Sequence, residues 1–231
     1  ANNRKYYSQG IQTVGKFFWG TQNVQSLELG LRFHQDEEDR FQWEDRFAIQ
    51  NGEMKRTTVA IKGSNANRVA SADALAAHAL YKITFDKLTL TPGLRYEHIK
   101  LRREDFGKED ANRTGIDLAT RENTVDVWIP GIGANYRISQ NLSFFGGIHK
   151  GFAPPGSSDG QKPEESVNYE LGSRFLIGGL NGEIVGFYND YSNLLGSDLA
   201  ASGGTGTLDQ FNAGKVIVNG LEVLLNYDIL Y

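Results

Sequence analysis

Apolar and polar residues alternate with a period of two along most of this chain. In VQSLELGLRFH, residues 24–34, apolar side chains occupy Leu27, Leu29, Leu31 and Phe33, and polar residues or glycine lie between them. The same alternation recurs in ALAAHALYKITF (74–85), LTLTPGLRYEH (88–98), WIPGIGANYRI (128–138), LSFFGGIHKGF (142–152), SVNYELGSRFLI (166–177), LNGEIVGFYNDY (180–191) and NGLEVLLNYD (219–228). A period of two repeated over so many segments predicts antiparallel strands, each with one apolar face.

Short and long connections alternate between these segments. The short ones fall near residues 21–23, 86–87, 139–141 and 178–179, and the long polar ones near residues 36–67, 103–121, 153–163 and 193–210. A soluble β-sandwich has no reason to sort its loops in this way. An outer-membrane barrel does, because its periplasmic turns are short and its extracellular loops are long. Prolines are then expected at the extracellular strand ends, where a ladder N–H is dispensable: Pro154, Pro155 and Pro163.

Composition excludes several other classes of protein. The chain has no cysteine, so it has no disulfide, thiolate metal site or cysteine nucleophile. Its net charge of −4 argues against nucleic acid as a partner. No stretch approaches the roughly 18 apolar residues of a membrane helix. Transmembrane β-strands of about 9–11 residues remain compatible with this hydropathy, because half of their residues are polar.

The two faces of the expected strands differ in the way a membrane barrel requires. One face is charged, as suits a wet or plugged lumen, and its candidate lumen-facing residues are Glu28, Arg32, Lys82, Arg95, Glu97, Arg137, Glu170, Arg174 and Glu222. The other face has aromatic residues near the short turns (Phe85, Tyr136, Phe175, Tyr227) and near the long connections (Tyr96, Trp128, Phe152, Tyr169). Two aromatic belts mark the membrane interfaces, although aromatics also favour strands in general. The predicted fold is all-β: part of an antiparallel transmembrane β-barrel, with a soluble β-domain as the alternative.

Three phrases resemble the barrel region of TonB-dependent outer-membrane receptors. The first combines Lys150–Pro155 with Lys162-Pro163-Glu164 and Tyr169-Glu170-Leu171-Gly172. The second is Phe211–Lys215 followed by Asn219–Glu222, and the third is Leu90–Glu97. They cover most of the chain from about residue 88 onward, in the order expected for that family.

The N-terminal stretch Arg4–Ile11 resembles the corresponding strand of the ferric-dicitrate and siderophore branch of these receptors. In that branch, extracellular arginines bind the anionic iron–citrate complex, and position carries this role onto Arg4 and Arg68. A guanidinium suits the role because it stays charged and pairs bidentately with carboxylates. The alternative for either residue is an ordinary loop arginine.

The resemblance implies a barrel of 22 strands with an N-terminal plug in its lumen. Residues 1–231, with about nine or ten expected strands, are then one internal barrel segment without the plug, and the lumen-facing residues become candidates for plug contact. The implied function is energy-coupled uptake of a ferric siderophore or ferric citrate across the bacterial outer membrane. The implied partners are the chelate, the TonB complex acting through the plug, and outer-membrane lipid with lipopolysaccharide; no cofactor is implied.

No catalytic or metal-binding constellation stands out in the sequence. The serines of Gly156–Gly160 lack the setting of a hydrolase nucleophile, so this segment is expected to be a flexible loop tip. His34, His78, His98 and His149 are scattered and predict no metal site. The acidic run Asp36–Arg40 is expected in an extracellular loop as a solvated charge cluster, with binding of divalent cations that bridge lipopolysaccharide as the alternative. The chain is therefore not expected to be an enzyme, and a passive porin or, more remotely, a barrel hydrolase remain the alternatives.

Overall fold

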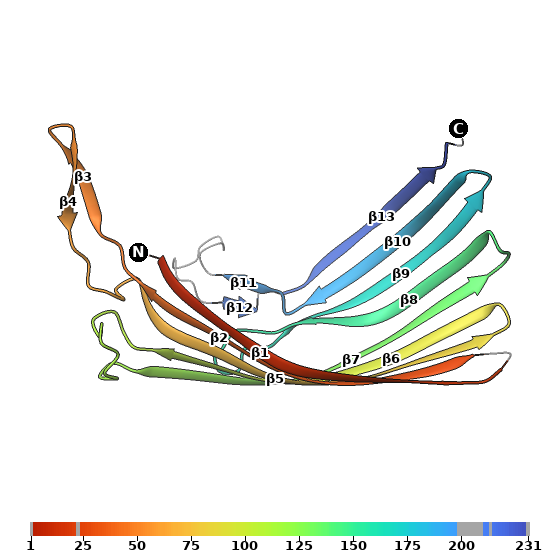
Figure 1. Ribbon diagram of the computed structural model, residues 1–231, viewed down its shortest axis with the longest axis horizontal. Coiled ribbons are helices and arrows are strands. Elements are labelled where there is room, and N and C mark those ends of the chain that lie inside the picture. The colour runs from red at the N-terminus through yellow and green to blue at the C-terminus, as the bar shows by residue number, and fades with distance from the viewer. Residues whose placement is uncertain (1, 22–23, 198–209, 213, 230–231) are drawn as a thin grey trace.

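The computed structural model describes residues 2–21, 24–197, 210–212 and 214–229. The described residues form one large antiparallel sheet with the order β1-β2-β5-β6-β7-β8-β9-β10-β13 (Figure 1). Its strands are β1 (Asn2–Trp19), β2 (Gln25–Gln42), β5 (Ala66–Phe85), β6 (Leu88–Asp105), β7 (Ala119–Arg137), β8 (Leu142–Ala153), β9 (Glu164–Ile177), β10 (Leu180–Ser192) and β13 (Val216–Tyr227). Two short hairpins lie in the connections: β3 (Arg46–Gln50) with β4 (Glu53–Thr58), and β11 (Leu195–Ser197) with β12 (Gln210–Asn212).

The predicted alternation of short and long connections is confirmed. Strands that are adjacent in the large sheet follow one another along the chain. The tight turns join them at one end of the strands, and the long connections join them at the opposite end (Figure 1). Two of the tight turns have two residues each, since Phe85 pairs with Leu88 and Ile177 with Leu180. In the turn at residues 21–23, Gln22 and Asn23 lie outside the described residues. The prolines also fall as expected, because β8 ends just before Pro154 and β9 begins just after Pro163.

The expected boundaries of the first long connection were wrong. Strand β2 continues to Gln42, so the acidic run Asp36–Arg40 lies inside a strand that pairs with β1 and β5 rather than in a loop. Cross-strand partners explain why acidic residues are tolerated there: the Tyr6 hydroxyl donates to Glu38 at 3.1 Å, and Arg4 lies 3.9 Å from the same carboxylate. Strands β1, β2, β5, β6 and β7 have 18 to 20 residues, about twice the length that crosses a membrane.

The pairing register gives the large sheet one charged face and one apolar face. Directly paired residues share a face, and the register therefore places every one of the nine candidate lumen-facing residues together on the charged face. On the apolar face, Leu31, Ile132 and Leu171 are exposed by 56%, 46% and 70%. Among the described residues, the buried hydrophobic side chains are Ala76, Ile99, Val125 and Val127, and all four lie on the charged face.

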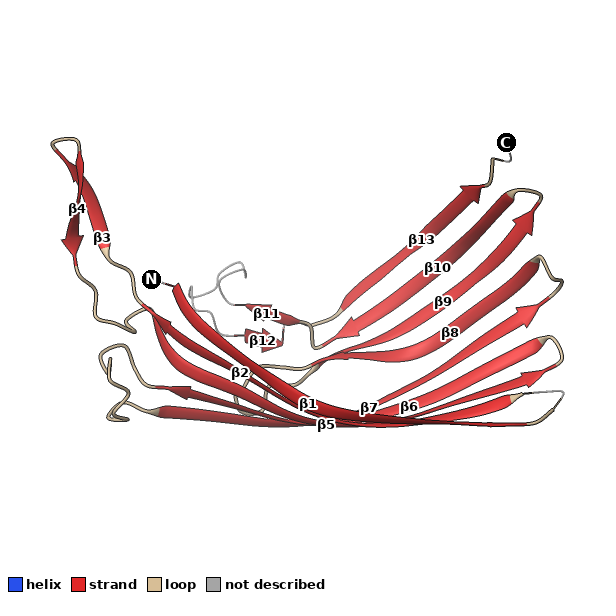
Figure 2. Cartoon of the chain, viewed as in Figure 1, coloured by secondary structure: helices blue, strands red, loops and turns tan. Residues whose placement is uncertain are grey.

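The apolar face is therefore not covered by a second layer of the described chain (Figure 2). A single curved sheet that turns an apolar face outward suits a lipid environment. The part of the chain that the structure describes has no helix long and apolar enough to cross a membrane.

Aromatic side chains mark both ends of the apolar face. Tyr96 and Trp128 pair across β6 and β7 with ring centroids 4.7 Å apart, on the side of the long connections. Phe85 and Tyr136 lie on the side of the short turns. Eight residues separate Trp128 from Tyr136, which corresponds to about 27 Å along an extended strand. For a strand tilted by about 40°, this span rises about 21 Å along the membrane normal, somewhat less than the apolar band of about 25 Å in an outer-membrane barrel.

Candidate ligand-binding site

Strand pairing brings together arginines that lie far apart in the sequence. Arg4 pairs with Arg40 across β1 and β2, and Arg40 pairs with Arg68 across β2 and β5. Arg103 of β6 pairs with Ala70, which is the next residue of β5 on the same face. We call Arg4, Arg40, Arg68 and Arg103 the arginine row. It lies on the charged face, at the end of the sheet that carries the long connections.

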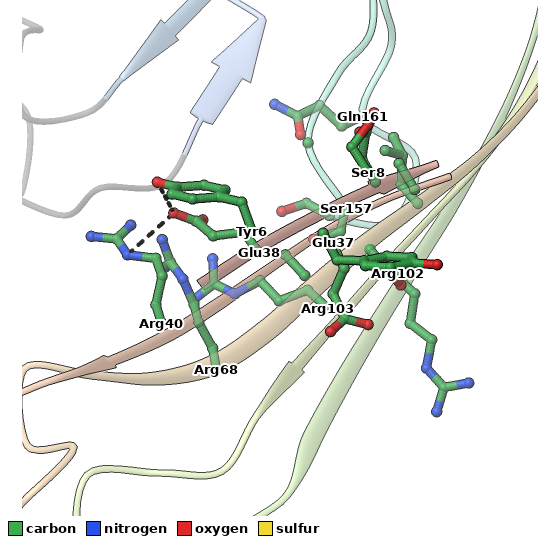
Figure 3. Close-up of a pocket in the computed structure, with 18 residues that line it drawn as sticks. Tyr6, Ser8, Glu37, Glu38, Arg40, Arg68, Arg102, Arg103, Ser157 and Gln161 are labelled. Atoms are coloured by element: carbon green, nitrogen blue, oxygen red, sulfur yellow. Dashed lines mark hydrogen bonds and ion pairs between the residues drawn. The ribbon is translucent and has the colours of Figure 1, made fainter. Parts of the chain in front are cut away.

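A cavity of about 670 Å³ lies against Arg40, Arg68 and Arg103 of this row, whereas Arg4 does not line it (Figure 3). Its floor is the charged face of β1, β2, β5 and β6, and its wall is the connection between β8 and β9. In Figure 3, the side chains of Arg40 and Arg68 project from the same side of their strands, whereas Arg102 projects to the opposite side. The lining residues that matter below are Tyr6, Glu38, Arg40, Arg68, Arg103 and Gln161.

The arginines of the row differ in how well they are neutralised. Glu38 lies 3.8 Å from Arg40 Nε and 3.9 Å from Arg4, and Asp105 lies 2.8 Å from Arg103 Nε. Within the described ranges, no carboxylate lies within 4 Å of the Arg68 guanidinium, and its buried Nε has no hydrogen-bond partner. Among the described residues, Arg68 is thus the member of the row without an ion pair within 4 Å, although Asp105, which faces it across β5 and β6, and Glu38 attract it from farther away.

The electrostatic setting of Arg68 follows from its position. It lies nine residues beyond Ala77, the residue that pairs with Tyr96 of the outer aromatic pair, and so lies outside the portion of β5 between the aromatic belts. Burial lowers the pKa of Arg68 from its ordinary value, and the neighbouring charges of Arg103 and Arg40 lower it further, whereas Asp105 and Glu38 offset part of this effect. A bound anion would relieve both effects. It would replace the solvation that Arg68 loses on burial, and its negative charge would offset the repulsion among the arginines.

The connection between β6 and β7 is fixed to the outside of the same strands by Arg113. Its guanidinium lies 5.2 Å from the ring centres of both Phe41 and Phe106. It also donates to Asp39 at 2.5 Å and to Asn67 Oδ1 at 2.8 Å. Side chains alternate between the two faces along a strand. Asp39, Phe41 and Asn67, which contact Arg113 on one face, are therefore chain neighbours of Arg40 and Arg68, which face the cavity on the other.

Replacing Arg113 should therefore loosen this connection. We expect Arg113→Ala to lower the local stability of residues 106–118 by about 2 kcal/mol, since it removes charge-assisted hydrogen bonds. Hydrogen exchange at the Phe106 amide, which donates to Asn67 O at 2.9 Å, would report the change. Arg113→Lys keeps the charge but not the planar fork, so it should fall in between. Unchanged protection in both variants would contradict the role of Arg113.

The same connection should also open at low pH. Asp110 accepts hydrogen bonds from the backbone amides of Thr114 and Gly115, both at 2.9 Å, and these contacts hold its pKa below the ordinary value. A carboxyl group with a depressed pKa stabilises the folded loop fully above its unfolded pKa of about 3.9, and this stabilisation is lost as the pH falls through the depressed value. We expect exchange of the Gly115 amide, corrected for its intrinsic rate, to accelerate below about pH 4. Asp110→Asn should remove that pH dependence.

The residues that the sequence singled out fall into two groups. Arg4 and Arg68 both belong to the arginine row, and their role in ligand binding remains a prediction. None of the nine candidate lumen-facing residues lines the cavity, and several are internally paired: Glu28 with Lys16 at 3.6 Å, Arg95 with Glu97 at 2.7 Å, and Arg174 with Glu183 at 2.6 Å. Across the described residues, no group of three His, Cys, Asp or Glu side chains could hold a metal ion.

Arg40, Arg103 and Gln161 were not predicted as site residues from the sequence. The two arginines fell inside or at the edge of segments expected to be loops, at residues 36–67 and 103–121. Continuing the period of two through residues 36–42 would have placed Arg40 on the same face as Glu28 and Arg32. The expectation of a flexible tip at Gly156–Gly160 gave no hint of contacts between this segment and β7.

Comparisons with known proteins agree with this architecture. A family model described as TonB dependent receptor-like, beta-barrel, matches residues 1–231. A curated relative, the ferric enterobactin receptor of Pseudomonas aeruginosa, is 25% identical over 238 residues, which cover 86% of this chain and 28% of the relative.

Solved structures show the same fold. The ferric citrate transporter FecA in its unliganded form is 20% identical, with a TM-score of 0.75 over 97% of this chain and 32% of that chain. The ferric-catecholate import receptor Fiu from E. coli K12 is 16% identical, with a TM-score of 0.71 over 99% of this chain and 36% of that chain. The chain therefore spans about a third of the length of these receptors, and its antiparallel strands match part of their barrel.

Proposed function

Because this chain belongs to the TonB-dependent receptor-like β-barrel family, we propose that it forms part of a receptor that takes up an anionic ferric chelate with energy from the TonB complex. Proteins of this family reside in the bacterial outer membrane and are transporters rather than enzymes. Relatives named for ferric enterobactin and ferric citrate support iron as the cargo.

The observation that carries the proposal is Arg68 in the cavity, the member of the row without a close ion pair among the described residues. A partly buried guanidinium between two other cations is unfavourable without a counter-charge, and the described protein supplies none within 4 Å. Carboxylate or other oxyanion groups of a chelate would pair with Arg68 and its neighbours in bidentate geometry. The arrangement therefore favours negatively charged chelates over neutral ones.

The remaining charged face has a different part in the proposal. We assign Glu28, Arg32, Lys82, Arg95, Glu97, Arg137, Glu170, Arg174 and Glu222 to the lumen, where they would contact a plug domain in the complete receptor. The plug would couple the barrel to the TonB complex, and the exposed apolar face would meet outer-membrane lipid and lipopolysaccharide. Residues 1–231 are on this view one barrel segment.

Uptake of radioactive iron by cells that express the complete receptor tests the proposed function. We expect uptake from ferric citrate or from an anionic tris-catecholate chelate, no uptake from a neutral tris-hydroxamate chelate, and no uptake of any in cells without TonB. Deletion of the gene should abolish growth on the transported chelate as sole iron source. Uptake that persists without TonB would indicate a passive porin instead, and the absence of uptake from every chelate would refute the proposal.

A further inference from the structure

We propose that Gln161 is a ligand-contacting residue of the cavity and that Asn123 is the positioning residue that holds it there. The inference rests on the proposed function, since it assigns a neutral hydrogen-bonding group to the same ligand that the arginine row binds. Both contacts lie in the segment Gly156–Gln161, of which Gly156–Gly160 was expected to be a flexible loop tip.

Asn123 fastens both ends of this segment to the sheet. It lies on the charged face of β7 and is only 8% exposed. Its side-chain amide donates to the backbone carbonyl of Gly156 at 3.2 Å and to that of Gln161 at 3.0 Å. The Gln161 backbone amide also donates to Ser158 O at 3.2 Å, which closes the segment into a turn. One buried side chain thus fixes where the cavity wall lies.

The side chain of Gln161 is left with unused hydrogen-bonding capacity. Gln161 lines the cavity together with the arginines (Figure 3). In this conformation both Nε2 and Oε1 are shielded from solvent, and in the described part of the chain neither has a hydrogen-bond partner. A bound group would therefore pair with them after the side chain rotates into the cavity. A buried amide without partners is unfavourable, so a bound group that satisfies it is favoured over one that does not.

The chemistry of the combined site narrows the ligand class. Guanidinium groups only donate hydrogen bonds, and they select negatively charged oxygens. An amide donates through Nε2 and accepts through Oε1, so it can read a group that does both, such as a hydroxyl. The cavity therefore fits a ferric chelate that carries oxyanions for the arginine row and a neutral hydroxyl, or a comparable donor and acceptor, for Gln161.

Affinity measurements on the complete receptor test the contact, with ferric citrate as the first probe. We expect Gln161→Leu, which keeps the volume but not the polarity, to weaken binding about tenfold. Asn123→Ala should weaken it to a similar extent, because the wall is no longer fixed. Asn168→Ala is the matched control: it removes an amide on the same charged face that donates to Ser166 Oγ at 3.0 Å and does not line the cavity. The affinity of Asn168→Ala for ferric citrate should equal that of the wild-type receptor.

A second measurement separates positioning from contact. The chain has no cysteine, so a nitroxide label can be attached at Asp159→Cys, an exposed residue of the segment, once cysteines elsewhere in the receptor are replaced. We expect Asn123→Ala to increase the mobility of this label without ligand, and Gln161→Leu to leave it unchanged. Each variant should keep the heat-dependent gel mobility of a folded barrel.

The outcomes distinguish the two proposals. If wild-type receptor binds ferric citrate and Gln161→Leu binds it equally well, the contact is refuted while the proposed function stands. If the label is equally mobile with and without Asn123, the positioning role is refuted. If wild-type receptor binds none of the chelates in the uptake panel, the proposed function fails, and the ligand contact fails with it.

Discussion

Arg68→Glu is expected to weaken binding of the ferric chelate by at least about thirtyfold, because truncating one partner of a buried charge pair costs about 2–5 kcal/mol and each 1.4 kcal/mol is a factor of ten. The substitution turns the cation without a close ion pair into an anion between Arg40 and Arg103. Binding should therefore be lost without loss of folding. Stability should change little, because repulsion from Arg40 and Arg103 becomes attraction while attraction to Asp105 and Glu38 becomes repulsion.

Arg102→Glu is the matched control for this prediction. Arg102 is the chain neighbour of Arg103 and also borders the cavity, but its side chain projects from the opposite side of the sheet (Figure 3) and forms ion pairs with Glu104 at 2.6 Å and Glu122 at 3.7 Å. Arg102→Glu changes the net charge of the receptor by the same amount as Arg68→Glu. The affinity of this variant for the chelate should stay within about twofold of wild type, since exposed ion pairs contribute little. Titration calorimetry with ferric citrate would measure both variants. Equal losses in the two would mean that net charge, and not the cavity, governs binding.

Ile132→Arg is expected to destabilise the receptor by about 2–4 kcal/mol in a lipid bilayer. Ile132 lies on the apolar face, midway between Trp128 and Tyr136 along β7, and its side chain is exposed by 46%. A guanidinium at this depth would have to remain in hydrocarbon or distort the bilayer. Folding in lipid vesicles as a function of urea concentration measures the change.

Gly133→Arg provides the control on the opposite face of the same strand. A Cβ atom added at Gly133 meets nothing within 4 Å, so the described chain leaves room for a side chain there. The charged face tolerates a further cation, and the cost should be much smaller than for Ile132→Arg. If the two variants were equally unstable, the assignment of the apolar face to lipid would be wrong.

The strands and their order could be predicted because a period of two needs no knowledge of distant residues. The end of β2 could not be predicted, because the acidic residues around Glu38 are held in the strand by Tyr6 and Arg4, more than thirty residues away. Local composition indicated a loop, and cross-strand pairing overrode it. The same error concealed Arg40, although its position in the alternation was correct for the charged face.

The candidate site was predictable only in part for a related reason. Arg4 and Arg68 were singled out by resemblance to a family, and the register places both in the arginine row. The contacts of the loops could not be predicted from the sequence, because a single residue, Asn123, that binds the backbone of Gly156 and Gln161 forms no recognisable motif. The two rings that enclose Arg113, Phe41 and Phe106, are likewise far apart in the chain.

The unusual length of β5 separates the place where the chelate would be captured from the membrane that it would then have to cross. Arg68 lies nine positions along the strand from Ala77, which is at the level of the outer aromatic pair, and this is a path of about 30 Å along an extended strand. In the proposed receptor, the arginine row would thus stand in the water outside the cell, beyond the hydrocarbon barrier. Capture of the chelate would then need no energy, whereas its passage inward would. Cells treated with an uncoupler should hold iron at their surface and import none of it.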